Sequence, residues 1–229
     1  MNKRGFTLLE LLIVLAIMGV MMGIVSFGLM GGGGAELGAA QRELLGLINN
    51  ARTQAALNGR DTRLIVNDDG SDLEKFHRYV EIVTRDANSS EEWLVQGEGR
   101  FLPEGIYFVP TDDSQATFSD DWLETAYSHW STKRGETFTL GESFKGKRKE
   151  GDGVKFNYVE FDDSGNLVCS QEQDSTSPTP PLMVLAKGSP DPSSSTKPVR
   201  FENAENIIGI QMRRYGGFAV LDVNDFGTF

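Results

Sequence analysis

Glu10 is the one charged side chain in a long apolar stretch near the start of the chain, residues 6–30. A single carboxylate within an apolar membrane span costs roughly 2.5–3.5 kcal/mol on insertion scales, so it requires a partner or a route to water. One interpretation places Glu10 near the cytoplasmic end of the span, where its side chain extends to the membrane interface. The other is a functional role, which depends on the residues around it.

The remaining reactive side chains form no catalytic or zinc-binding pattern. Of the two histidines, His77 and His129, neither has a second histidine or a cysteine at zinc-site spacing. The single cysteine, Cys169, has no nucleophile–base motif around it and cannot form an intrachain disulfide. The glycine run 31–34 follows no strand and lacks the Gly-Lys-Ser/Thr of a phosphate loop. We therefore predict no catalytic residue, no metal and no cofactor, and a chain that is not an enzyme.

Two groups of acidic turn residues leave calcium binding open. Asp68, Asp69 and Asp72 form one group, and Asp162 and Asp163 form the other. Calcium prefers several oxygen ligands, but the spacing of an EF-hand is absent from both groups. Turn geometry alone accounts for these residues.

The apolar stretch 6–30 predicts a membrane-spanning helix. A helix of about 25 residues, rising about 1.5 Å per residue, exceeds the roughly 30 Å of a bilayer core. The stretch is also longer than the apolar region of a secretory signal, which is about 7–15 residues. Lys3 and Arg4 before it, and Glu36 after it, place the N-terminus in the cytoplasm. We expect a single-pass protein of the inner (cytoplasmic) membrane, with its C-terminal domain in the periplasm.

Length and charge limit the rest of the molecule. The chain has 229 residues, which suffices for a span and one domain of roughly 150–200 residues. Its net charge is -11, and loss of Lys3 and Arg4 with a short leader would leave -13. This acidic balance argues against nucleic-acid binding, although residues 145–149 form a local basic run.

The order of residues from Lys3 to Glu10, KRGFTLLE, resembles the type III signal of type IV pilins and type II secretion pseudopilins. The resemblance implies that a prepilin peptidase cleaves between Gly5 and Phe6 and that the new amine of Phe6 is N-methylated. It also implies that Glu10 pairs with the Phe6 amine of a neighbouring subunit during assembly. Because each charge is costly alone in low dielectric, such a pair would fix the register of assembly.

Residues 35–57 predict an amphipathic helix that ends at Asn58-Gly59. Its apolar positions recur at helical spacing, at Leu37, Ala40, Leu44, Ile48, Ala51 and Ala55. Glycines 31–34 predict a break or hinge between the membrane span and this helix, with a plain linker as the alternative. We expect one face of the helix to be covered by a sheet.

Short strands separated by turn residues follow the helix. The ranges expected to be strands are 62–66, 76–84, 93–95, 105–109, 155–162, 167–169, 182–186, 199–201, and a hairpin of 207–215 with 218–223. Residues 67–70 and 163–166 predict turns, and 171–181 and 189–198 predict polar loops. The fold class is therefore α+β, with a long N-terminal helix packed on an antiparallel β-sheet.

Three stretches resemble the H-type minor pseudopilins, the GspH/FimT-like group. They are residues 50–59 leading into 62–66, the order from Trp93 through Leu102-Pro103 to 105–109, and the run 161–165. Residues 111–153 depart from that pattern and predict an insertion with one short helix around 121–130. Its aromatic residues Trp122, Tyr127 and Trp130 are interpreted as packing residues, with a partner-contacting patch as the alternative.

The resemblance predicts four parts of the chain. They are a leader (1–5), a transmembrane and assembly helix (6–30), a glycine break with an amphipathic helix (31–59), and a periplasmic β-rich pseudopilin domain (60–229). The implied function is that of a minor pseudopilin in a type II secretion pseudopilus. Its implied partners are the prepilin peptidase, other pseudopilins or pilins, and the inner-membrane assembly platform. Two alternatives stay open, a minor type IV pilin for adhesion or DNA uptake, and a membrane-anchored enzyme or sensor.

Overall fold

The computed structural model describes residues 32–88, 93–110, 113–122, 139–140, 156–168, 182–213 and 217–225. The chain divides into two compact units, Met1–Ala35 and Glu36–Phe229, and every described strand belongs to the second. The predicted leader and the predicted span 6–30 lie outside the described residues.

Helix α2 (Gly32–Asn58) is the long helix that the apolar periodicity predicted. All six predicted face residues are buried, together with Leu47. The helix ends in a Schellman arrangement, in which Gly59 has φ +59° and the Arg60 amide donates to the Ala55 carbonyl at 3.2 Å. The predicted stop at Asn58-Gly59 is therefore confirmed.

The start of α2 corrects one expectation. Gly32, Gly33 and Gly34 form the first turn of the helix, where a break had been expected. Each glycine in a helix interior costs about 1 kcal/mol relative to alanine, but this cost does not prevent helix formation when neighbouring turns are stable. Gly31 and the residues before it lie outside the described part, so a break at that point stays a prediction.

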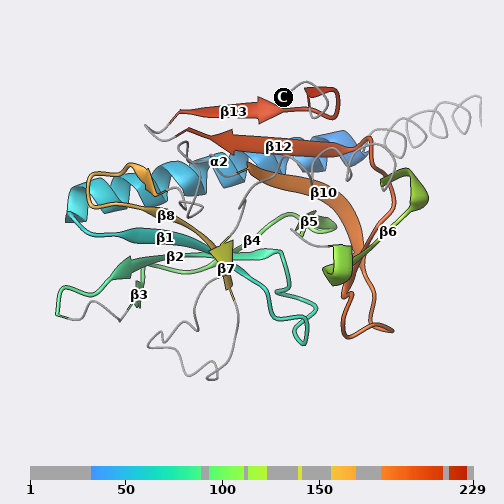
Figure 1. Ribbon diagram of the computed structural model, residues 1–229, viewed down its shortest axis with the longest axis horizontal. Helices are drawn as coiled ribbons and strands as arrows, with labels where there is room; N and C mark the ends of the chain where they lie inside the picture. Colours follow the sequence, from blue (N-terminus) through green and yellow to red (C-terminus); the bar gives the residue numbers. More distant parts are fainter. Residues whose placement is uncertain are drawn as a thin grey trace, which may run out of the picture. The chain divides into compact units, whose positions relative to one another are not determined.

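The first sheet is antiparallel throughout its described pairs. Its spatial order is β3 (Trp93–Val95), β2 (Tyr79–Arg85), β1 (Thr62–Asn67), β8 (Phe156–Phe161) and β7 (Thr139–Leu140), with β4 (Arg100–Phe101) beside β2 and β9 (Leu167–Val168) beside β8. Its centre is the pairing of β1 with β2 on one side and β8 on the other, shown in Figure 1.

The second sheet contains one parallel pair. Its order is β13 (Phe218–Leu221), β12 (Ile207–Met212), β10 (Leu182–Pro190), β11 (Val199–Phe201) and β6 (Ala116–Phe118), with β5 (Ile106–Phe108) beside β10. The pair β6–β11 is parallel and the other described pairs are antiparallel. The hairpin of β12 and β13 confirms the predicted last hairpin.

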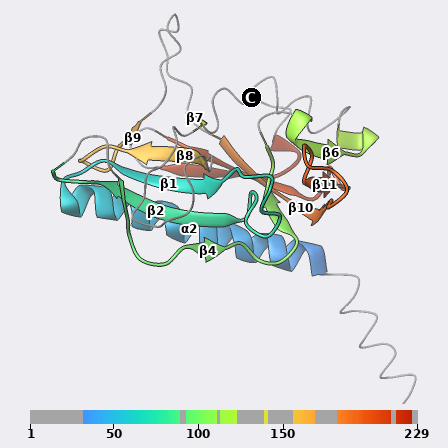
Figure 2. The same cartoon turned by 90° about the horizontal axis from the view of Figure 1, so that it is seen from below.

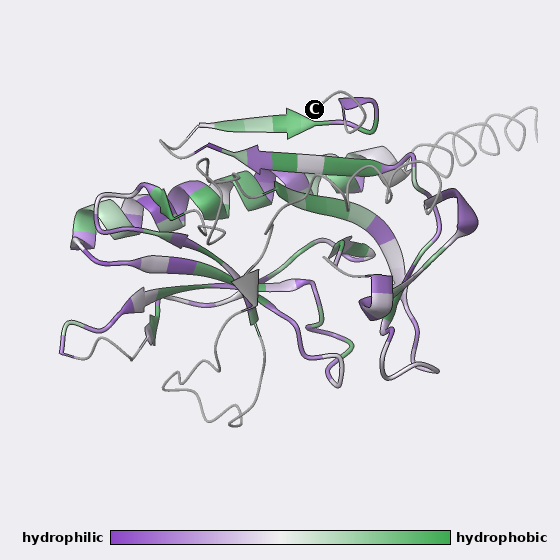
Figure 3. Ribbon diagram, viewed as in Figure 1, coloured by the Kyte–Doolittle hydropathy of each residue, from purple (hydrophilic) through white to green (hydrophobic). Residues whose placement is uncertain are grey.

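Helix α2 covers one face of both sheets (Figure 2). The main core contains the buried face of α2 and side chains from both sheets, including Leu64, Val80, Val159, Met183 and Ile210. Each sheet also has a second apolar cluster, centred on Val83 and Phe156 in the first sheet and on Trp122 and Phe201 in the second. Figure 3 shows the apolar residues concentrated along β10, β12 and β13.

The fold class is confirmed as α+β, a helix packed on antiparallel sheet, with corrections in detail. There are two described sheets, and the second includes one parallel pair, in which β6 from the predicted insertion lies beside β11. Strand β2 begins at Tyr79, whereas the sequence predicted it from residue 76. Ser189 and Pro190, expected in a loop, extend β10 and pair with β11.

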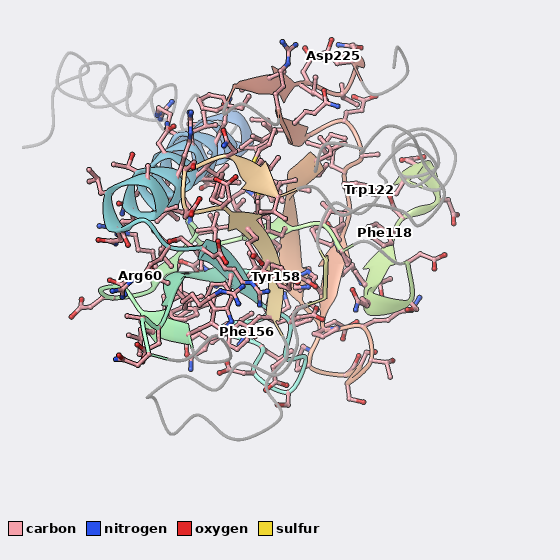
Figure 4. The ribbon with its side chains drawn as sticks, turned by 60° about the vertical axis from the view of Figure 1, so that its left-hand side comes forward. Arg60, Phe118, Trp122, Phe156, Tyr158 and Asp225 are labelled. Atoms are coloured by element: carbon pink, nitrogen blue, oxygen red, sulfur yellow. The ribbon has the colours of Figure 1, made fainter. Side chains whose placement is uncertain are left out.

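Of the three aromatic residues that were interpreted as packing residues of the insertion, the structure describes Trp122. Residues 113–115 form a short 3-10 helix (η1, Asp113–Gln115) before β6. Trp122 is fully buried, and its ring lies close to that of Phe118 (Figure 4). The centroid of the Trp122 ring is 5.4 Å from that of Phe118 and 5.7 Å from that of Phe201. This confirms the packing interpretation for Trp122. Tyr127 and Trp130 lie outside the described residues.

Candidate functional site

The predicted processing and assembly residues Gly5, Phe6 and Glu10 lie outside the described residues. Their roles therefore stay predictions. Within the described part of the chain, no helix is both long and apolar enough to cross a membrane. Along the sequence, the first described element after these residues is α2.

Helix α2 is fixed to the domain through one face. Besides the apolar core, Glu36 in its second turn lies 3.4 Å from the Nζ of Lys187 on β10. On its outer face Gly46, Asn49 and Thr53 are exposed, and a Cβ added at Gly46 would meet nothing within 4 Å. This outer face is the part of α2 that is open to contacts with other molecules.

The turn after β8 docks onto α2. The Oδ1 of Asp162 accepts hydrogen bonds from the amides of Ser164 and Asn166, which closes the turn. Gly165 has φ +78°, and its carbonyl accepts a hydrogen bond from the Nε of Arg52 at 3.0 Å. The run 161–165, singled out for its resemblance to H-type domains, thus fastens the first sheet to the helix.

Asp68, His77 and Asn157 form a cluster of buried polar side chains. The Nε2 of His77 lies 2.6 Å from the Oδ1 of Asp68 and 3.5 Å from the Nδ2 of Asn157. The Nδ1 of His77 lies 3.1 Å from the carbonyl oxygen of Phe108. The Phe76 ring stacks on the imidazole at 4.0 Å, and the side chains of His77 and Asp68 are 2% and 3% exposed.

This cluster was not predicted from the sequence. His77 was placed in a strand, but it lies in the connection between β1 and β2 with φ +52°, a conformation uncommon for a residue with a side chain. An Asp–His pair is also found in nucleophilic catalysis. Here the second ring nitrogen faces a backbone carbonyl and the ring is buried, so the described contacts leave it no nucleophile to activate.

The acidic residues considered for calcium have protein partners. Asp69 accepts hydrogen bonds from Ser71, Asp72 lies 3.7 Å from the Nζ of Lys75, and Asp162 closes its own turn. Among the described residues, no three His, Cys, Asp or Glu side chains come together in a group that could hold a metal ion. Cys169 and His129 lie outside them.

A cation–aromatic stack lies on the face of the first sheet opposite α2. The guanidinium of Arg63 lies between the rings of Trp93 and Tyr158, 4.1 and 4.0 Å from their centroids. Its Nε donates to Glu160 at 2.6 Å, and Arg85 approaches the same carboxylate at 3.6 Å. Figure 4 labels Tyr158 and Phe156, both of which lie on β8. Arg85 also lies 2.9 Å from the Asp61 carboxylate, so the two guanidinium groups face two carboxylates. The stack lies beside the apolar cluster of this sheet face.

Among the described residues, the ionisable groups with a displaced pKa are Tyr107 and Asp191. Burial raises the pKa of the Tyr107 hydroxyl above its usual value of 10.0, and the nearby Arg78 guanidinium offsets part of this rise. Hydrogen bonds from Ser193 lower the pKa of the partly buried Asp191 carboxyl. Neither group adjoins the Asp68–His77 pair through a described hydrogen bond, so neither extends that cluster into a larger site.

Comparison with known proteins identifies the kind of signal at the N-terminus. Residues 1–26 match the family model described as the prokaryotic N-terminal methylation motif. This match confirms the prediction of a pilin-like, prepilin-type N-terminal signal. It covers the segment with Gly5, Phe6 and Glu10, but the role of each residue stays a prediction.

The other comparisons are weaker. No curated protein matches the chain. Among solved structures, the chain is similar to the minor pseudopilin EpsH from the type 2 secretion system of Vibrio cholerae, with 12% identity and a TM-score of 0.40. The similarity covers 82% of this chain and 97% of that one. The fold class rests on the described helix and strands themselves.

Proposed function

We propose that the chain is a minor pseudopilin, a structural subunit of a type II secretion pseudopilus that is processed by a prepilin peptidase and has no enzymatic activity. The observation that carries the proposal is the match of residues 1–26 to the N-terminal methylation motif. The domain architecture is compatible with it, because α2 begins soon after the matched segment and both sheets pack against that helix.

The N-terminal residues take three roles in this proposal. The peptidase cleaves between Gly5 and Phe6, and the new amine of Phe6 is methylated. Glu10 then pairs with the Phe6 amine of a neighbouring subunit. An ammonium and a carboxylate attract strongly in the apolar core of a filament, and each is costly there alone, so the pair selects one register between subunits.

The location follows from the charge pattern around the span. Lys3 and Arg4 hold the N-terminus in the cytoplasm, and the domain after α2 lies in the periplasm. The partners are the prepilin peptidase, other pseudopilins, and an assembly platform in the inner membrane. The outer face of α2 and the sheet surfaces are then available to neighbouring subunits of the filament.

Intact and N-terminal mass spectrometry of the protein made in its own host tests the processing. We expect a mature chain that starts at methylated Phe6. A chain that retains Met1 would mean that the N-terminus is a plain membrane anchor, and the proposal would fail.

Substitution of Glu10 tests the assembly. We expect Glu10→Leu to insert and to be cleaved, but to be largely lost from purified filaments, because the Phe6 amine of the neighbour is left without its carboxylate. Glu36→Gln is the matched control, since it removes an exposed carboxylate that lies beyond the span. Normal incorporation of Glu10→Leu would contradict the pairing.

Deletion of the gene distinguishes secretion from the alternative function. Loss of protein secretion with no change in surface filaments supports the pseudopilin. Loss of surface pili, adhesion or DNA uptake with normal secretion would identify a minor type IV pilin instead.

A further inference from the structure

The hydrogen-bond partners of His77 restrict where protons lie. Its Nδ1 faces the carbonyl oxygen of Phe108 at 3.1 Å. A carbonyl oxygen only accepts, so Nδ1 carries a hydrogen and donates it. Its Nε2 faces a carboxylate oxygen of Asp68 at 2.6 Å, a distance typical of a strong, charge-assisted hydrogen bond.

A proton must lie between Nε2 and the Asp68 oxygen. If neither atom carried one, two lone pairs would face each other at 2.6 Å, and a buried carboxylate would lack its closest partner. With one proton the pair is neutral overall, which suits its almost complete burial. The Asn157 amide, 3.5 Å from Nε2, is too distant to replace this hydrogen bond.

The pair also joins the two sheets. Asp68 directly follows β1 of the first sheet, and Phe108 lies in β5 of the second sheet. The His77 amide donates to the Asn67 carbonyl at 2.9 Å, and its carbonyl accepts from the Phe108 amide at 2.9 Å. His77 thus contacts both sheets through its backbone and its ring, and the left-handed backbone places the ring between them.

We propose that Asp68 and His77 hold one shared proton in the folded domain, and that this proton couples the junction of the two sheets to pH. In the unfolded chain above pH 7, a carboxyl is ionised and an imidazole is neutral, so the proton is absent. Unfolding then releases one proton. The folding equilibrium constant falls tenfold for each pH unit above 7 for as long as the folded pair keeps the proton, equal to about 1.4 kcal/mol per unit.

Other ionisable groups of the neighbouring elements have separate partners. In the connection between β1 and β2, Asp72 faces Lys75 at 3.7 Å, and Arg78 donates to the Leu102 carbonyl. On β5, Tyr107 lies near Arg78, and its raised pKa places its ionisation above pH 10. Among the described residues, Asp68 is therefore the charged group in direct contact with the imidazole.

The test is the pH dependence of unfolding of the full chain in a mild detergent, purified through a histidine-free tag. Asp68→Asn replaces the shared proton with an amide hydrogen that donates to a neutral imidazole, so we expect it to fold and to lose the tenfold-per-unit dependence between pH 7 and 9. Asp69→Asn makes the same change at the adjacent position, where the carboxylate accepts from Ser71, and is expected to keep it. An equal slope in the wild type and Asp68→Asn would overturn the proposal.

A second measurement decides the case if Asp68→Asn fails to fold. The chain has two histidines, so ¹⁵N-histidine labelling gives two ring systems, and His129→Gln assigns them. We expect a far-downfield ring proton on His77 that persists from pH 6 to 9 in the wild type. Its absence at pH 7 would overturn the shared proton.

Discussion

Gly165→Ala tests how the turn after β8 is fastened to α2. Gly165 has φ +78°, where a residue with a Cβ costs roughly 1–2 kcal/mol. A Cβ at this position would lie 3.0 Å from the Arg52 carbonyl oxygen and 3.3 Å from the Cβ of Ala56. The turn must therefore move away from the helix, which weakens the hydrogen bond from Arg52, worth about 1 kcal/mol.

These effects exceed the opposing one. Alanine reduces the freedom of the unfolded chain, which favours folding by about 0.4–1 kcal/mol. We expect a net loss of about 2 kcal/mol in the free energy of unfolding. For a domain of this size, that loss lowers the Tm by roughly 4–8 °C.

Two other glycines serve as controls in the same thermal and denaturant unfolding assay. Gly59 has φ +59°, and an alanine Cβ there would have no atom within 4 Å, so Gly59→Ala measures the backbone cost without the close contact. Gly46 lies in the middle of α2 with the same open space and no left-handed backbone, so Gly46→Ala should raise the stability by roughly 0.5–1 kcal/mol. If Gly165→Ala were no worse than Gly59→Ala, the close approach to α2 would contribute nothing and the reasoning would fail.

Two further predictions concern the core and the alkaline limit of stability. Leu44→Ala, at a fully buried position of α2, should cost about 2–5 kcal/mol in denaturant unfolding, whereas Leu57→Ala, at a position 80% exposed on the same helix, should change it by less than about 0.5 kcal/mol; equal effects would contradict the assigned inner face. Because burial raises the pKa of the Tyr107 hydroxyl in the folded state, the buried neutral hydroxyl contributes fully to stability below pH 10. That contribution is lost as the pH rises through the higher pKa of the folded state. The free energy of unfolding of Tyr107→Phe should therefore fall less steeply with rising pH above pH 10 than that of the wild type. If circular dichroism showed the same alkaline unfolding profile for both proteins, burial of the Tyr107 hydroxyl would not contribute as proposed.

The helix and most strands could be predicted because their residues carry local signals. The inner face of α2 follows a 3.6-residue period, and Gly59 supplies the left-handed residue at its end. Strands such as β1 and β12 are rich in β-branched or apolar residues and are bounded by polar turns. These features depend on neighbours within a few positions, which a sequence displays directly.

The division into two sheets could not be predicted in the same way. It depends on strand pairs such as β6 with β11, in which Ala116 lies opposite Val199. These two strands are parallel and far apart in the sequence. The late start of β2 has a similar cause, since residues 76–78 resemble a strand by composition, but hydrogen bonds from the Phe76 and Tyr79 amides to Asp72 and Lys75 close turns there.

The candidate sites differ in the same way: the contiguous motif could be predicted from the sequence, and the cluster built from distant residues could not. The signal around Gly5, Phe6 and Glu10 is a contiguous motif, so its class could be recognised from the sequence and is confirmed by the motif match. The Asp68–His77 cluster was missed because Phe108 and Asn157, which complete it, lie on two other strands. A histidine in an apolar segment with an aspartate nine residues earlier was the available signal, and it is weak.

The sharing of α2 between two sheets has a consequence for the order of folding. The first sheet cannot close until Phe161 is available to pair with Thr62, and the second cannot close until β12 follows β10. Such long-range pairing is slow, because much loop entropy is lost before the contacts form. In a chain that emerges N-terminus first, the part of the apolar face of α2 that the second sheet covers therefore stays uncovered until β12 has been made. An apolar surface exposed for that interval invites aggregation, so folding of this domain depends on how soon β10 and β12 follow the first sheet.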